Sequence, residues 1–412
     1  MAAAGTSLLD LVWAPRESQQ EGQMHERWLI LAVLTFARTA MGFQFQSVAA
    51  VSPFLLDQFQ MSYAALGTLV GLYLVPGIAV ALPGGVLAQR FGDKRIVCVG
   101  LAAMTFGGAL MGATESSSAL AAGRVVSGAG AVLLNVLVTK MVADWFQGRE
   151  SATALGILIT SWPLGIAIAL VVLPAFTNAF SWPAAMYATA AVSAAALALV
   201  AISYRAPTPS HATEPGRFQF GLTGHELRLA MLAGLVWTFY NVGFIVVLAF
   251  GPDFLIATGH KAAAASAIVS TVSWVIIPAL PIGAWLAERV GRPDVTMIAC
   301  FLLATLAIWL VASLGPSIPL FVVIGLIFGP PGGLIMTLPG EAVRLERRAI
   351  VMGVYFTCYY VGMGVAPALA GYARDLTGNA AAPLWFAGAM LIMASLMLFQ
   401  FRYMQSRLPQ AP

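Results

Sequence analysis

Two arginines, Arg38 and Arg124, lie inside long apolar stretches of this 412-residue chain. Arg38 follows Arg27 by eleven residues, which is about 16 Å along a helix that rises about 1.5 Å per residue. An arginine at the centre of such a stretch costs about 2.5–3.5 kcal/mol, so it normally faces a cavity, a partner or a ligand. The usual partner is a carboxylate, but all 17 Asp and Glu residues fall in polar segments or outermost turns, with Asp253 the nearest exception. A cation without a buried carboxylate favours binding of an anion.

Each arginine also has a structural interpretation. Backbone carbonyls at a helix break near Gly42, or the side chains of Gln44 and Gln46, could satisfy Arg38 within its own helix. Arg124 lies only a turn or two from the end of its apolar stretch, so its side chain reaches water more easily. The sequence leaves open whether either arginine contacts a ligand.

The other candidate ligands of a small solute are polar and aromatic side chains in apolar stretches. Tyr355 and Tyr359 are four residues apart and therefore share one face of a helix. Aromatic residues in such helices more often serve packing than binding. The complete candidate set for substrate binding is Arg38, Arg124, Gln44, Trp237, Tyr240, Asn241, Trp274, Tyr355 and Tyr359.

The sequence predicts no catalytic residues, metal site or cofactor. The four histidines are scattered over the polar segments, and the three cysteines show no CxxC spacing. A membrane-embedded enzyme, which would need clustered His, Asp, Glu or Cys residues, is therefore a remote alternative.

The composition of the chain indicates which kind of secondary structure holds these residues in place. Hydrophobic residues make up 60% of the chain and charged residues 9%, with a mean hydropathy of +0.86, whereas soluble domains carry about 25% charged residues. The apolar stretches are long enough for helices to cross about 30 Å of hydrocarbon. We therefore expect an all-α integral membrane protein in a lipid bilayer, with twelve transmembrane helices at 28–56, 63–88, 96–114, 119–142, 151–177, 182–204, 228–255, 262–287, 294–313, 318–339, 349–373 and 383–401.

Lys and Arg positions predict the orientation. With twelve spans both termini lie on one side, and that side carries 17 of the 21 Lys and Arg residues, against Lys261 and Arg374 on the other. The positive-inside rule makes both termini cytoplasmic. The formal net charge of +4 then reflects topology and gives no indication of nucleic-acid binding. We expect a monomer in the bacterial inner (plasma) membrane.

An internal repeat divides the chain. A shift of 199 residues pairs Gly84, Leu87, Ala88, Arg90 and Gly92 with Gly283, Leu286, Ala287, Arg289 and Gly291. We therefore expect two pseudo-symmetric halves that rock about a substrate site between them. The predicted segments are a tail at 1–27, six-helix bundles at 28–204 and 228–401, a linker at 205–227 and a tail at 402–412.

The repeated loop identifies a family resemblance. Gly85 to Arg95 closely resembles the G-x-L-a-D-r-x-G-r-k-r signature of the major facilitator superfamily, and a partial copy spans Gly283 to Arg292. Arg124 to Gly130 resembles the family's R-x-x-q-G-x-g motif. The resemblance implies that these loops latch the cytoplasmic side in the outward-open state. The implied latch residues are Gly85, Gln89, Arg90, Gly92, Arg95, Glu288, Arg289 and Gly291.

One position departs from the signature. Gln89 stands where the family has an acid, while Glu288 keeps the acid in the second copy. The charged latch is therefore expected to be stronger on the second half. Alternatively, Arg90, Lys94 and Arg95 are only positive-inside anchors.

The resemblance implies a secondary active or facilitative transporter of a small molecule that works by alternating access. The stretches Lys140 to Gly165 and Gly353 to Gly378 resemble bacterial cyanate-type small-anion porters. With no acid or histidine well inside a span, we expect exchange (antiport), uniport, or symport of a proton carried by the substrate. The expected solute is an inorganic anion or a carboxylate; the alternative is a neutral or drug-like compound.

Overall fold

The computed structural model describes residues 16–146, 150–206, 222–343 and 347–406. Parts of the predicted tails and linker, residues 1–15, 207–221 and 407–412, lie outside these ranges. The described chain is built from helices and has no strand. Its helices are α1 (Arg16–Ala50), α2 (Ser52–Phe59), α3 (Tyr63–Leu72), α4 (Gly77–Phe91), α5 (Asp93–Ala113), α6 (Ser117–Trp145), α7 (Ser151–Ala179), α8 (Trp182–Ser203), α9 (Gly224–Ala257), α10 (Ala262–Val290), α11 (Pro293–Leu314), α12 (Ile318–Ile335), α13 (Leu338–Glu341), α14 (Arg348–Thr377) and α15 (Ala382–Gln405).

Twelve segments of the described chain are long and apolar enough to span a membrane, which confirms the predicted number. Two of the predicted spans are interrupted in the structure. The first stops at Ala50, because Val51 leaves the helical conformation and Pro53 starts the short α2. The second is divided into α3 and α4 by a turn before Pro76, which cannot donate a helical hydrogen bond.

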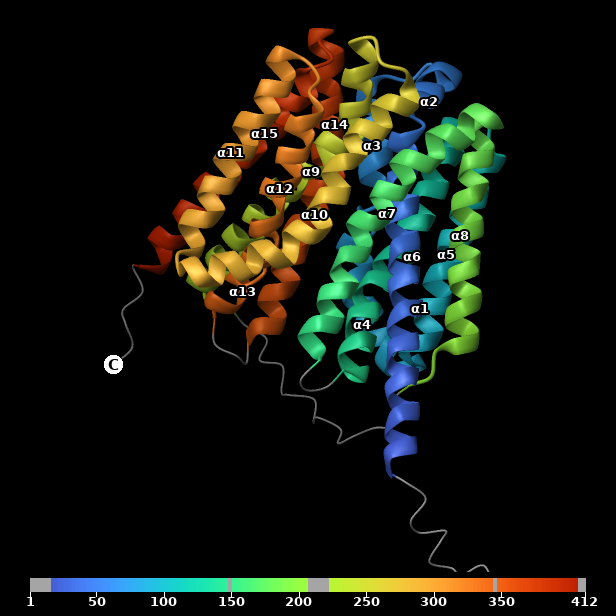
Figure 1. Cartoon of the computed structure of the whole chain (residues 1–412), viewed down its shortest axis with the longest axis vertical. Helices are drawn as coiled ribbons and strands as arrows, with labels where there is room; N and C mark the ends of the chain where they lie inside the picture. The colour runs from blue at the N-terminus through green and yellow to red at the C-terminus, as the bar shows by residue number, and fades with distance from the viewer. Residues whose placement is uncertain (1–15, 147–149, 207–221, 344–346, 407–412) are drawn as a thin grey trace, which may run out of the picture.

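The helices form two groups, which confirms the predicted two-half fold (Figure 1). The N-terminal half contains α1 to α8, and the C-terminal half contains α9 to α15. We call the end of the bundle where α1 begins and α15 ends the terminal face, and the opposite end, with α2 and the start of α3, the distal face.

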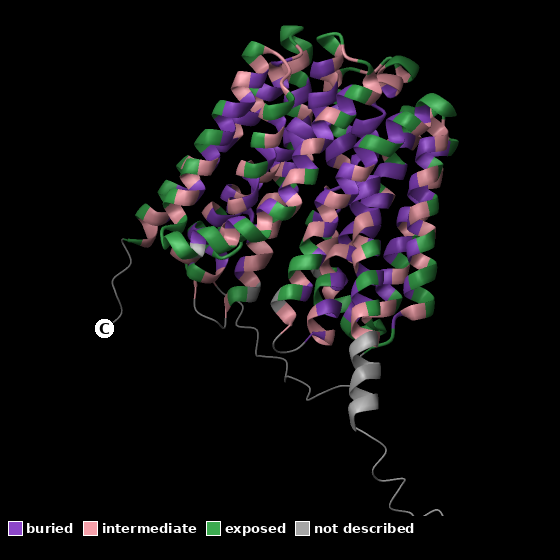
Figure 2. Ribbon diagram, viewed as in Figure 1, coloured by how far each residue is buried: buried purple, intermediate pink, exposed green. Residues whose placement is uncertain are grey.

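The two halves pack together in the distal part of the molecule, where α3 lies against α14 and α7 against α10. Glycines permit this close approach: a Cβ atom on Gly67 or Gly71 of α3 would collide with the backbone of Pro367 or Gly364 in α14. Buried residues gather along the same seam, whereas the ribbons spread apart toward α4 and α13 (Figure 2). The fold therefore joins the halves at the distal face.

Candidate functional site

Arg38 lies on α1 and donates hydrogen bonds to two other helices of its half. Its Nε atom donates to Asn135 Oδ1 of α6 at 3.0 Å, and its Nη1 atom donates to the carbonyls of Leu158 and Ile159 in α7 at 2.6 and 3.2 Å. Pro163 explains why a carbonyl is free, because it has no N–H to donate to Ile159 four residues earlier. The hydrogen-bond partners of Arg38 therefore lie on α6 and α7. They do not lie at Gly42, Gln44 or Gln46 of its own helix, where the structural interpretation placed them.

The second terminal nitrogen of Arg38 has no hydrogen-bond partner in the part of the chain that the structure describes, and no described carboxylate pairs with this arginine. The hydroxyls of Tyr359 and Tyr360, on α14 of the other half, interact with it electrostatically. Asn135 lies close to the Tyr360 hydroxyl. Arg38 thus lies near two tyrosines of the other half, with two N–H donors unused.

An aromatic cluster on the C-terminal half faces this contact. The Trp237 ring stacks on Tyr240 and Tyr355 with centroid distances of 5.7 and 6.2 Å, and it lies 6.2 Å from the ring of Tyr359. The Trp237 Nε1 atom is buried and has no acceptor among the described residues. A buried indole donor normally finds a partner. The cluster therefore offers a second unused donor, the Trp237 N–H. The Trp237 ring neighbours Tyr359, which in turn lies near Arg38.

The other predicted ligands on this half already have partners. Tyr240 donates to the Phe328 carbonyl at 2.6 Å, Tyr355 to Met336 Sδ at 3.4 Å, and Asn241 to the Trp237 carbonyl at 2.8 Å. Trp274 on α10 is 43% exposed and does not stack on the cluster. In this conformation the hydroxyl donors of Tyr240 and Tyr355 are occupied, and Asn241 uses one of its two amide N–H donors.

Arg124 is enclosed by the helices of the N-terminal half. Its side chain is fully buried, and it donates to the carbonyls of Leu69 and Gln44, each at 2.9 Å, and to the carbonyl of Phe45. Its guanidinium also lies 4.5 Å from the centre of the Tyr73 ring, a cation–π contact. The expectation that Arg124 lines the site is therefore corrected for this conformation: helix packing encloses it.

The spacing of Arg124 and Gly128 in the family motif has a physical explanation. Leu69 is among the last residues of α3, whose carbonyls lack helical partners, and a cation there also complements the helix dipole. Gly128, one turn after Arg124, allows the close approach of α6 to the backbone of Tyr73. The motif thus fastens the end of α3 to α6.

Gln44 is also part of this buried framework. Its Nε2 atom donates to the Met104 carbonyl at 2.8 Å, and its Oε1 atom accepts from the Tyr73 hydroxyl at 3.4 Å. With no exposed surface, Gln44 cannot contact a solute in this conformation.

Sequence reasoning missed Asn135 and left Tyr360 out of the candidate set. Asn135 is the only side-chain amide within α6, and a lone amide in an apolar span carries a desolvation cost unless it is hydrogen-bonded. That signal could have identified it. Its contact with Arg38 joins two spans that no sequence spacing connects.

The predicted latch loops lie at the terminal face, and none of their described side chains forms an ion pair with the other half. Gln89, Arg90, Arg95 and Arg289 are exposed, and Gly92 and Gly291 adopt positive φ angles of 87° and 66° that favour glycine. Gly85 has open space beside it, and the side chain of Glu288 lies outside the described residues.

Ion pairs at the terminal face stay within each half across the described chain. Arg27 pairs with Glu150 and Lys140 with Asp93 in the N-terminal half. The C-terminal half has its own pairs, Arg347 with Glu226 and Arg402 with Asp294 and Glu341. None of the described ion pairs at the terminal face connects the two halves.

We expect Gln89→Asp to shift the population toward the state in which the distal face is open, because a carboxylate can pair with basic residues when the terminal face closes. The measurement is the distance between spin labels on cysteines at Ser118 and Ser313, exposed distal positions of the two halves, after the native cysteines are replaced by alanine. The distance should lengthen, while Gln89→Asn should change nothing. A shorter or unchanged distance in Gln89→Asp would contradict the latch.

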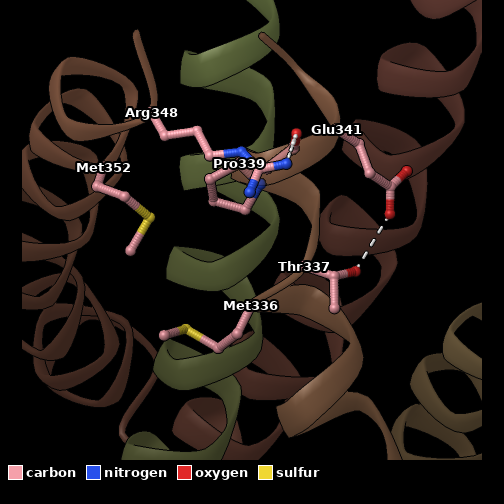
Figure 3. A pocket seen from close by; sticks show the side chains of 7 residues that line it. Met336, Thr337, Pro339, Glu341, Arg348 and Met352 are labelled. Carbon is pink, nitrogen blue, oxygen red and sulfur yellow. Dashed lines mark hydrogen bonds between the residues drawn. The ribbon is translucent and has the colours of Figure 1, made fainter. Parts of the chain in front are cut away.

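A pocket of about 470 Å³ opens between α13 and the start of α14 at the terminal-face end of the C-terminal half (Figure 3). Arg348 lies in it and donates weakly to the Gly340 carbonyl at 3.4 Å, and Thr337 donates to Glu341 at 3.2 Å. Met336 lines the pocket and accepts the hydrogen bond of Tyr355. Met336 therefore contacts both the pocket and Tyr355 of the aromatic cluster.

Comparison with known proteins agrees with this architecture. The sequence profile of the Major Facilitator Superfamily matches residues 33–367 and 229–411. A hexuronate transporter of Bacillus subtilis is 22% identical over 381 residues, which cover 86% of this chain and 90% of that protein. An uncharacterized transporter of the same bacterium, YycB, is 25% identical over 397 residues, covering 90% and 91%.

Solved structures share the fold. A bacterial homologue of the human lysosomal transporter Spinster, in an inward-facing and unoccupied conformation, aligns with a TM-score of 0.72 at 16% identity over 94% of this chain and 99% of that chain. A D-xylose–proton symporter aligns with a TM-score of 0.73 at 13% identity over 91% and 97%. The chain therefore belongs to the major facilitator superfamily and is a multi-pass membrane transporter, not an enzyme.

Proposed function

We propose that this protein transports a small anionic solute, in particular a carboxylate, by alternating access, and that Arg38 binds the anionic group. The observation that carries the proposal is the unpaired terminal nitrogen of Arg38, near Tyr359 and Tyr360 of the other half and with no described carboxylate paired to it. An uncompensated guanidinium in a membrane protein favours an anionic ligand.

The occupied donors of Arg38 limit how it can bind. Its Nε and Nη1 atoms are held by Asn135, Leu158 and Ile159. Only Nη2 is free, so an anion would bind there end-on unless it displaces Asn135. The unused Trp237 Nε1 atom could donate a hydrogen bond to another oxygen of the solute.

One relative is compatible with this solute class. The name of the Bacillus subtilis hexuronate transporter denotes a sugar acid, which carries a carboxylate and several hydroxyl groups. A solute of that kind would use both the cationic and the aromatic donors of the site. At this level of identity we propose the class, a hydroxylated carboxylate, and no individual compound.

The positive-inside count makes the terminal face cytoplasmic. Since the described halves join only at the centre and the distal face, we infer that this conformation is open to the cytoplasm. The pocket beside Met336 would then lie on the solute's route to the cytoplasm.

The test is uptake by purified protein in proteoliposomes, with competition by small inorganic anions, hydroxylated carboxylates, neutral sugars and cationic dyes. We expect carboxylates to compete and to raise the melting temperature, since a ligand that binds only the folded state stabilises it. The aromatic cluster around Trp237 supports a second candidate, a neutral ring compound. Stabilisation by neutral compounds with no effect of any anion would favour that candidate and contradict the first.

A further inference from the structure

Four residues at the distal face form one connected group, which we call the distal cluster: Tyr63 of α3, Asp253 of α9, and Arg374 and Asp375 of α14. The Tyr63 hydroxyl donates to Asp253 Oδ1 at 2.9 Å and accepts a weak bond from Arg374 Nη2 at 3.4 Å. The Arg374 Nε atom lies 3.2 Å from Asp253 Oδ2 in an ion pair. The Arg374 guanidinium also lies 4.7 Å from the centre of the Tyr63 ring.

Asp375 adds a second connection to the same helix. Its two carboxylate oxygens accept from the backbone N–H groups of Tyr63 and Ala64, at 2.9 and 2.8 Å. These are the first two residues of α3, whose N–H groups have no helical acceptors. A carboxylate at this helix end is also favoured by the helix dipole.

The distal cluster joins the two halves. Tyr63 and Ala64 belong to the N-terminal half, whereas Asp253, Arg374 and Asp375 belong to the C-terminal half. Among the described residues the ion pairs of the terminal face make no such connection. The distal face can open only if α3 separates from Asp253, Arg374 and Asp375.

Asp253 and Arg374 form the least exposed ion pair of the described chain, with side chains 13% and 12% exposed. Other charged or titratable groups near this face are Asp57, Glu115, His260 and Lys261. None of them pairs with Asp253 in the described structure, and His260 Nδ1 lies 3.2 Å from the Leu255 carbonyl. The charge of Asp253 is therefore balanced by Arg374 alone, assisted by the Tyr63 hydroxyl.

We propose that Asp253 is the proton-binding residue that controls opening of the distal face. A proton from the distal side binds the carboxylate, which becomes neutral and no longer pairs with Arg374. Arg374 is then a poorly solvated cation without a counterion, an unfavourable state that hydration relieves. Separation of α3 from α9 and α14 admits that water, and re-formation of the ion pair releases the proton.

This proposal goes beyond the anionic solute and is independent of it. Sequence analysis does not predict a proton carrier here, because Asp253 lies only a turn from the end of its span. Its burial by Tyr63 and Arg374 arises from contacts between helices.

The experiment measures the distal distance between labels at Ser118 and Ser313, and a terminal-face distance between labels at Ile202 and Val295, both exposed. It uses the full chain in nanodiscs without solute, over a range from about pH 8 to about pH 4 that ends near the ordinary pKa of an aspartate side chain. We expect the distal distance to lengthen and the terminal distance to shorten as the pH falls. For one proton, the ratio of open to closed molecules changes by at most about tenfold per pH unit.

Asp253→Asn imitates the protonated carboxyl and should show the long distal distance at every pH. Asp253→Glu should keep the pH response, and Asp57→Asn, which removes an exposed carboxylate at the same face, should leave it unchanged. A wild-type distance that does not change with pH, or a pH response that survives in folded Asp253→Asn, would overturn the proposal. Because no solute is present, neither result depends on the proposed substrate.

Discussion

Replacing Arg38 by alanine is expected to abolish binding and transport of the anion while the protein remains folded. Truncating one partner of a hydrogen-bonded charge pair costs about 2–5 kcal/mol, which corresponds to an affinity loss of about 30-fold or more. The stability change should be small. The carbonyls of Leu158 and Ile159 lose a donor. The same substitution removes an unpaired cation from a poorly solvated site, which offsets that loss.

Arg38→Lys provides the sharper comparison. It keeps the positive charge but loses the planar guanidinium, which here donates to Asn135 and α7 while leaving one nitrogen free. We expect a large loss of transport with normal folding. The measurements are uptake in proteoliposomes and ligand-induced change in melting temperature, each normalised to folded protein. Normal anion transport by folded Arg38→Ala, or a parallel fall of transport and folded protein, would contradict the proposed role of Arg38 in binding the anion.

The opposite pattern is expected at Arg124. Arg124→Gln removes a fully buried cation that bonds to the carbonyls of Leu69, Gln44 and Phe45. Buried acceptors left without donors cost about 1–3 kcal/mol each when water cannot reach them. We therefore expect a destabilisation of about 3–5 kcal/mol, with a lower melting temperature and less folded protein.

The matched control is Arg38→Gln, the same chemical change at the other intramembrane arginine. The fraction of transport retained per folded molecule should be high for Arg124→Gln and near zero for Arg38→Gln. Thermal unfolding and uptake of the two variants, measured side by side, check this contrast. A stable Arg124→Gln protein that has lost anion binding would instead place Arg124 in the site.

The comparison of these two arginines shows how far the candidate site can be predicted. Both are single cations in apolar stretches, and the sequence alone gives Arg124 the stronger family motif. Their environments differ because Arg124 meets the last carbonyls of α3, whereas Arg38 meets the carbonyl freed by Pro163 and keeps one nitrogen unpaired. Neither contact follows from a spacing along the chain, since each joins residues more than fifty positions apart.

The aromatic candidates show the same limit. The helical spacing of Tyr355 and Tyr359 placed them on one face, and both lie near Trp237. Whether a ring offers a free donor depends on its neighbours: Tyr355 is occupied by Met336, while the Trp237 Nε1 atom has no acceptor in the described chain. Periodicity predicts a shared face, but not which polar atom on that face stays unsatisfied.

The sequence by itself determined the membrane-spanning fold, the number of spans and the family, because hydrocarbon forces each crossing segment to be a long apolar helix with its backbone bonds satisfied internally. The repeated loop around Gly92 and Gly291 likewise revealed two halves, since a duplicated chain keeps local turn chemistry. Only the tertiary structure decided which end is closed and which charges are paired. Those depend on contacts such as Asp375 with Tyr63 and Asp253 with Arg374, which form when α3 of one half meets α9 and α14 of the other. A local sequence pattern contains no information about those distances, because helix packing sets them.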